Sequence, residues 1–178
     1  MYNYFFRATY RTKTYIAADW TGDKDAVDQL YKWNDSDYWS LHFVDAHDLT
    51  QSKDTSLNCS IKSSLKTRLD ASKTFVLIVG EDTKSLRSGS CAYCDSYSSY
   101  YVRCNRGYSV DYRSYINYEC EKAVDADIKI VVLYNSTKVD KSKCPDAVKD
   151  LGNHVAMKCN KDGVEEWDYK SVKSAIMD

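Results

Sequence analysis

Glu119 is the residue of this sequence whose type and position could do chemistry, because it falls inside an apolar stripe. At about 100° per residue, the steps of three and four between apolar residues place them on one face of a helix. Glu121 lies about half a turn away from that face and should meet water. The stripe consists of Tyr112, Tyr115, Ile116, Cys120 and Ala123.

A carboxylate among apolar neighbours is paired, neutralised, or placed at the edge of a pocket. A pair with a nearby Arg or Lys is the structural interpretation of Glu119. An active-site carboxylate is the functional one, since groups with a perturbed pKa gather at functional sites. The pattern alone leaves both open.

Short apolar runs alternate with helical spacing along the chain, and this arrangement must position Glu119. The alternation predicts right-handed crossovers and an α/β fold, specifically a doubly wound, flavodoxin-like five-stranded parallel sheet in the order 2-1-3-4-5. A single domain over 1–178 is expected from the length. The expected strands cover 14–18, 40–46, 75–79, 128–133 and 155–159, and the helices fall near 24–31, 57–69, 112–125, 146–150 and 164–176. The second helix should turn Lys62, Lys66 and Arg68 outward, and residues 2–10 could add an edge strand.

The carboxyl ends of parallel strands form the usual ligand edge of such a sheet. Each residue there also has a plain interpretation as a cap or turn residue. The residues that follow the expected strands are Asp19 and Trp20, Asp45 and His47, Gly80 to Thr83, and Tyr134 and Asn135.

A segment rich in Ser, Tyr and Cys, at about 84–110, is too long for an ordinary connection. Insertions of this length are commonly lids, binding loops or partner surfaces, so we expect it to gate or complete the site. Cys91, Cys94 and Cys104 could hold zinc if a fourth ligand arrived, such as Cys59 or Cys120. The second close pair that structural zinc sites usually have is missing, so we expect no metal.

Composition excludes several other functions. With 25 Lys plus Arg against 26 Asp plus Glu, the net charge of -1 gives no electrostatic argument for binding nucleic acid or an anionic membrane. No apolar run is long enough for a membrane helix, no signal peptide is recognisable, and the odd number of cysteines favours reduced thiols, so we expect a cytoplasmic protein. Neither a dinucleotide-cofactor fingerprint, a P-loop, nor a nucleophile elbow is present.

Three sequence segments together resemble a known family. FVLIVGEDT at 75–83, YINYECEKA at 115–123 and the following IKIVVLYN are similar to TIR-like domains, specifically the TIR-like component of Thoeris antiphage systems. The family pattern is an apolar strand ending near Gly-x-x-Thr, then a helix carrying glutamate, then a second apolar strand. Tyr115 departs from it, because tryptophan is common there.

The resemblance implies an enzyme that cleaves NAD and makes a cyclic ADP-ribose-type signal in antiphage defence. It implies Glu119 as the catalytic residue, with substrate contacts from Asp19, Trp20, Gly80, Thr83 and Tyr115. NAD is then a substrate and no cofactor is needed; the implied partners are NAD, an effector reached through the diffusible nucleotide, and copies of the chain in a homo-oligomer. The alternative is a non-catalytic TIR-like module for interaction or nucleotide binding.

Overall fold

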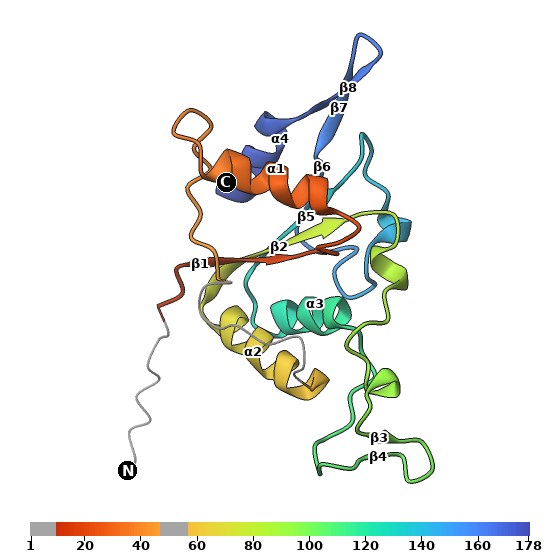
Figure 1. The fold of residues 1–178 in the computed structure, drawn as a ribbon. Coiled ribbons are helices and arrows are strands. Elements are labelled where there is room, and N and C mark those ends of the chain that lie inside the picture. Colours follow the sequence, from red (N-terminus) through yellow and green to blue (C-terminus); the bar gives the residue numbers. More distant parts are fainter. Residues whose placement is uncertain (1–9, 47–56) are drawn as a thin grey trace.

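The computed structural model describes residues 10–46 and 57–178, which form an α/β fold around a parallel sheet (Figure 1). Four strands lie in the order β1-β2-β5-β6, and each neighbouring pair is parallel. Almost every residue of the central strand β2 is buried, as expected for a strand covered on both faces. The strands are β1 (Lys13–Ala17), β2 (Ser72–Val79), β5 (Lys129–Tyr134) and β6 (Asn153–Ala156).

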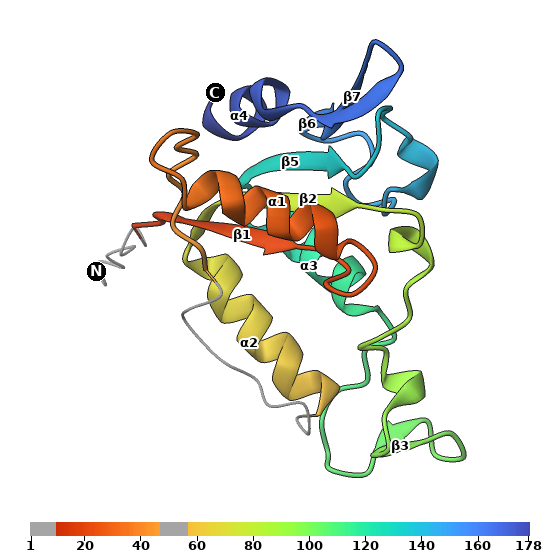
Figure 2. The same cartoon turned by 45° about the horizontal axis from the view of Figure 1, so that its top comes forward.

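Helices cover both faces of the sheet, which confirms the expected doubly wound architecture (Figure 2). Helices α1 (Lys24–Asn34) and α4 (Tyr169–Met177) pack on one face, around a core that includes Leu30. Helices α2 (Asn58–Asp70) and α3 (Tyr115–Asp125) pack on the other face, around a core that includes Phe75. The sheet therefore separates two apolar cores.

The expected strand at 40–46 is reduced to one bridge, between Thr14 and Asp45. That bridge is parallel and lies beside β1, so the segment takes its predicted place in the order 2-1-3-4-5 without forming a strand. Ser40 and His42 have φ angles of 48° and 50°, which interrupt an extended backbone. Leu41 and Phe43 are still buried, so the alternation seen in the sequence reports burial here and not a strand.

The C-terminal region also differs from expectation. The strand expected at 155–159 corresponds to β6, which ends at Ala156. The chain continues into an antiparallel hairpin of β7 (Lys158–Lys161) and β8 (Val164–Trp167). The expected helix at 164–176 therefore begins only at Tyr169. Asp162 and Gly163 both have positive φ, the geometry of a tight hairpin turn, and the Asp-Gly pair was the missed signal.

The insertion at 84–110 is folded into short elements. They are η2 (Thr83–Ser85), η3 (Cys91–Tyr93) and a small hairpin of β3 (Tyr97–Ser98) and β4 (Arg103–Cys104). The hairpin projects beyond α2 and α3, away from the sheet (Figure 1). After η4 (Lys141–Lys143), residues 146–150 form turns and not the expected helix.

Two expectations fall outside the described residues: the edge strand at 2–10, apart from its last residue, and His47. None of the helices in the described parts of the chain is both long and apolar enough to cross a bilayer.

Candidate functional site

Glu119 is held at its position by the first turns of α3. Ser114 caps that helix, since its side chain accepts a hydrogen bond from the backbone N–H of Asn117. The helix therefore starts later than the sequence stripe suggested, and Tyr112 lies outside it, exposed. Glu119 is 7% exposed, whereas Glu121 is half-exposed and pairs with Arg113. The predicted difference between the two glutamates is confirmed.

The Glu119 carboxylate meets strand β1 through a single hydrogen bond. The Tyr15 hydroxyl donates to its Oε1 atom at 2.5 Å. Burial raises the pKa of the Glu119 carboxyl to about 7, against the lowering effects of the Tyr15 bond and the Arg68 charge. Oε2 forms no hydrogen bond with the described residues, so a ligand can engage that oxygen.

Glu119 lines a pocket of about 290 Å³ at the carboxyl end of β1. Asp19, Trp20 and Tyr115, all proposed from the sequence, share this pocket with it. The other lining residues come from the end of β1, from α2 and α3, and from the start of the insertion: Ala18, Ile61, Leu65, Arg68, Leu86, Ser88 and Ile116.

Gly80 and Thr83 lie outside the lining of that pocket. The Gly80 N–H donates to the Thr83 hydroxyl at 2.8 Å, and a Cβ at Gly80 would collide with the Asp23 carboxylate. Asn135 donates to Asp23 at 3.1 Å, and burial together with nearby carboxylates raises the pKa of Asp23. These residues form a neighbouring polar cluster at the same edge of the sheet.

Two further residues of the expected ligand edge lie elsewhere. Asp45 is bridged to Thr14 near the amino end of β1, where it accepts a hydrogen bond from the Tyr31 hydroxyl. Tyr134 is buried, and its hydroxyl forms a hydrogen bond with His154. Neither residue faces the Glu119 pocket.

The base of the insertion forms part of the rim of the pocket. The Tyr115 hydroxyl donates to Asn58 at 2.9 Å, and its backbone N–H donates to the Ser88 carbonyl at 2.8 Å. Gly89 lies against the Tyr115 ring so closely that an added Cβ would approach the ring to 2.5 Å. Its φ of 91° suits glycine alone. Tyr115 thus joins α3, α2 and the insertion.

A buried cation on α2 fixes the other end of the insertion. Lys62 was expected to point outward but is 4% exposed and donates to the carbonyl of Arg113 at 2.7 Å. Its Nζ atom also lies 3.3 Å from the Asp111 carboxylate. Although partial burial opposes the shift, the Arg113 hydrogen bonds and the Lys62 charge lower the pKa of Asp111 to about 2.

Sequence reasoning missed Tyr15, Arg68 and Lys62. Tyr15 was read only as part of a strand, and the two cations were assigned to the outer face of a helix. Arg68 is also buried, at 8% exposure. The available signal was that a buried carboxylate on one helix needs a cation on a neighbouring helix, since charges inside a protein need partners.

No cluster of three or more His, Cys, Asp or Glu side chains suited to a metal occurs in residues 10–46 and 57–178. All seven cysteines are free thiols. The absence of structural zinc stays a prediction, to be decided by measurement.

The N-terminal part of the chain matches a known protein family. Residues 14–88 match the family described as Thoeris protein ThsB, TIR-like domain. The matched segment runs from β1 through β2 into the insertion and includes Asp19, Trp20 and Arg68, while Glu119 lies beyond it. The comparison with curated proteins finds no match. The resemblance drawn from the sequence motifs is confirmed for residues 14–88, which include the motif at 75–83, while the motifs at 115–123 and 128–135 lie outside the match.

Proposed function

We propose that this TIR-like protein, related in its first half to Thoeris ThsB, cleaves NAD at the nicotinamide–ribose bond and forms a cyclic ADP-ribose-type signal. One observation carries the proposal: a buried carboxylate, Glu119, lines a pocket at the carboxyl edge of the sheet with one oxygen available. The site would serve antiphage defence by releasing a nucleotide that a separate effector recognises.

One carboxylate is enough for this reaction. Nicotinamide leaves as a neutral molecule, so the leaving group needs no general acid. The ribose develops positive charge in an oxocarbenium-like transition state, which a carboxylate in a water-poor site stabilises strongly. Glu119 supplies that charge in its ionised form, and its Oε2 atom can accept a hydrogen bond from a ribose hydroxyl.

The Tyr15 hydrogen bond orients Glu119, and Tyr15 and Arg68 both favour the ionised form of its carboxyl group. Burial raises the pKa of Glu119, while the Tyr15 hydrogen bond and the Arg68 charge both lower it. Burial also keeps Tyr15 protonated, because it raises the pKa of that phenol well above 10, so the hydroxyl remains a donor. The balance holds the Glu119 carboxylate close to its ionisation point at neutral pH.

The volume of the pocket suits part of the substrate. About 290 Å³ is near the lower end of the 300–1,000 Å³ typical of ligand pockets. We assign the nicotinamide riboside half of NAD to this space, between Trp20 and Tyr115. The adenosine half would extend past Asp19, where a second copy of the chain could complete the site.

Side-by-side variants test the proposal. Glu119→Gln keeps the side-chain volume and removes the charge, so NAD turnover should fall by about 10²–10³-fold. Glu121→Gln is the matched control on the same helix and should retain turnover, because Glu121 pairs with Arg113 at the surface. Products are identified by mass spectrometry, with and without lysate from infected cells. Full turnover in Glu119→Gln, or equal loss in both variants, would contradict the assignment.

The alternative is a TIR-like module that binds a nucleotide or a partner without turnover. One observation favours this alternative. The hydrogen bond from Tyr15 to Glu119 links β1 to α3, so Glu119 also has a structural role. Saturable NAD binding without product under all the conditions above would support that alternative.

A further inference from the structure

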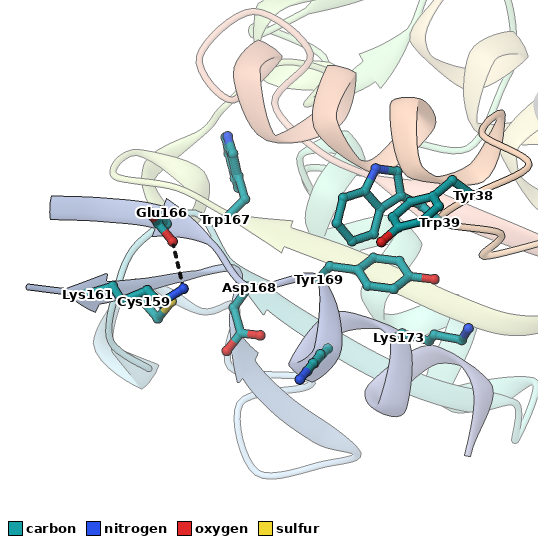
Figure 3. Close-up of a pocket in the computed structure, with 10 residues that line it drawn as sticks. Tyr38, Trp39, Cys159, Lys161, Glu166, Trp167, Asp168, Tyr169 and Lys173 are labelled. Carbon is teal, nitrogen blue, oxygen red and sulfur yellow. Dashed lines mark ion pairs between the residues drawn. The ribbon is translucent and has the colours of Figure 1, made fainter.

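A second pocket, of about 530 Å³, lies on the opposite face of the sheet from Glu119. Its walls come from the turn that follows α1, from the β7–β8 hairpin and from the start of α4 (Figure 3). The volume falls well inside the range of ligand pockets. Nothing in the proposed NAD reaction uses this pocket.

Aromatic rings form one side of this second pocket. Trp39 and Tyr169 have ring centroids 4.7 Å apart, and Tyr38 lies 4.9 Å from Trp39. Tyr38 is 84% exposed and Trp39 is 36% exposed, so a large apolar surface faces solvent at the entrance. The rings pack edge to face, with interplanar angles of 61° for Trp39 and Tyr169 and 86° for Tyr38 and Trp39. The exposed face of one such ring can stack on a nucleobase, because every base has a π face.

Charge is distributed unevenly around the rings. Lys161 pairs with Glu166 at 3.7 Å, on the side of the pocket away from Tyr38 and Trp39 (Figure 3). Lys170 and Lys173 form no ion pair with the described residues, and Lys173 lies 5.5 Å from the centre of the Tyr169 ring. The positive charge available to a ligand is therefore next to the aromatic rings.

The N-terminus of α4 does not account for this arrangement. Asp168 already caps that helix, accepting hydrogen bonds from the backbone N–H and the hydroxyl of Ser171. The Tyr169 hydroxyl is buried without a hydrogen-bond partner among the described residues, although buried hydroxyls are nearly always paired. The fold alone gives no reason for a tyrosine instead of a phenylalanine here.

We propose that this pocket binds a nucleotide, with the base stacked on the exposed face of Trp39 beside the Tyr169 ring and the phosphate held by Lys170 and Lys173. A planar base and an anionic phosphate on one small molecule match an aromatic wall flanked by two lysines with no carboxylate partner. On the other side of the pocket Lys161 and Glu166 pair with each other, so the lysines without a carboxylate partner are Lys170 and Lys173, and these set the direction of binding.

Calorimetric titration of the full chain with AMP tests this site separately from NAD cleavage, because AMP has no nicotinamide–ribose bond. AMP should bind, while adenosine and ribose 5-phosphate should each bind at least about tenfold more weakly, since each lacks one recognised group. The double variant Lys170→Glu with Lys173→Glu should weaken AMP binding by at least about tenfold and leave adenosine binding unchanged.

Tyr100→Ala is the matched control, because Tyr100 is an exposed aromatic residue that lines neither pocket, and it should bind AMP as the parent does. Trp39→Ala should lose binding, with its melting temperature measured because Trp39 packs on Tyr169. The proposal fails if AMP does not bind, if binding survives the lysine double variant, or if Tyr100→Ala alone abolishes it. Each of these outcomes is independent of whether NAD is cleaved.

Discussion

At the scale of single residues, Glu119 has a stability cost that depends on pH. Its pKa of about 7 in the folded chain lies above the ordinary value of 4.5, so the folded state holds this proton more tightly than the unfolded state. Between these two values the unfolded state binds fewer protons, and the unfolding free energy therefore falls as pH rises. Above about pH 7 the cost is fully present, and below 4.5 it is absent.

Glu119→Gln should therefore be more stable than the parent at pH 8, by about 1–3 kcal/mol. The difference should shrink through the window from about 7 to 4.5 and vanish at lower pH. Urea unfolding of both proteins at several pH values measures it. A variant less stable than the parent at pH 8 would show that Glu119 is mainly an ion-pair partner of Arg68.

At the scale of elements, the base of the insertion and the segment that follows its hairpin have different roles. Gly89→Ala and Gly107→Ala both place an alanine at a positive φ, of 91° and 77° respectively, so they share a backbone cost. Only the first adds a methyl group against the Tyr115 ring, whereas nothing lies within 4 Å of the second. Gly89→Ala should lose at least about 1 kcal/mol more in unfolding free energy.

NAD turnover should also fall in Gly89→Ala and not in Gly107→Ala, because Tyr115 lines the Glu119 pocket. Equal stability and equal turnover in these two variants would make the insertion independent of the site.

Lys62 offers a second test at this scale, on the contact between α2 and the segment before α3. Lys62→Met removes a buried cation from the Asp111 carboxylate and from two carbonyl groups, so we expect a loss of about 2–4 kcal/mol. Lys66→Met is the control, since that exposed lysine pairs with Asp70 on the surface and should change stability by less than about 0.5 kcal/mol. Chemical unfolding measures the loss of unfolding free energy in both variants. An equally small loss in Lys62→Met and Lys66→Met would contradict the burial of Lys62.

How far the sequence predicts these elements depends on how local their signals are. Apolar runs identify β1, β2 and β5, because buried parallel strands are continuous in sequence. The segment at 40–46 shows the limit: its alternation is that of a strand, but two residues with positive φ prevent a ladder. The Asp162–Gly163 pair was a local signal for a hairpin turn, but the helical spacing of the apolar residues after it led to the prediction of a helix. The burial of Lys62 and Arg68 could not be predicted from one helix, because their partners are distant in sequence.

At the scale of the whole molecule, the described structure is stabilised by two apolar cores, one on each face of the sheet. The cores meet across β2, where Phe75 and Leu77 face one side and Val76 and Ile78 face the other. No disulfide contributes, since all seven cysteines are free. The Glu119 pocket and the aromatic pocket belong to different faces, so each can be altered without disturbing the packing of the other.

Because the packing of the two apolar cores stabilises the fold, we expect that neither a chelator nor a reductant changes the melting temperature of the protein. Loss of a structural disulfide commonly removes about 2–5 kcal/mol, which for a chain of this size lowers the midpoint by about 5–15 °C, and loss of a structural metal removes more. Differential scanning calorimetry with EDTA or a phosphine reductant should instead give midpoints within about 1 °C of the untreated protein. Elemental analysis of the same sample measures its zinc content and serves as the control. Near-stoichiometric zinc that is lost when Cys91 and Cys94 become serine, together with a lowered midpoint, would mean that the insertion is organised by metal and not by its contacts to Tyr115 and Lys62.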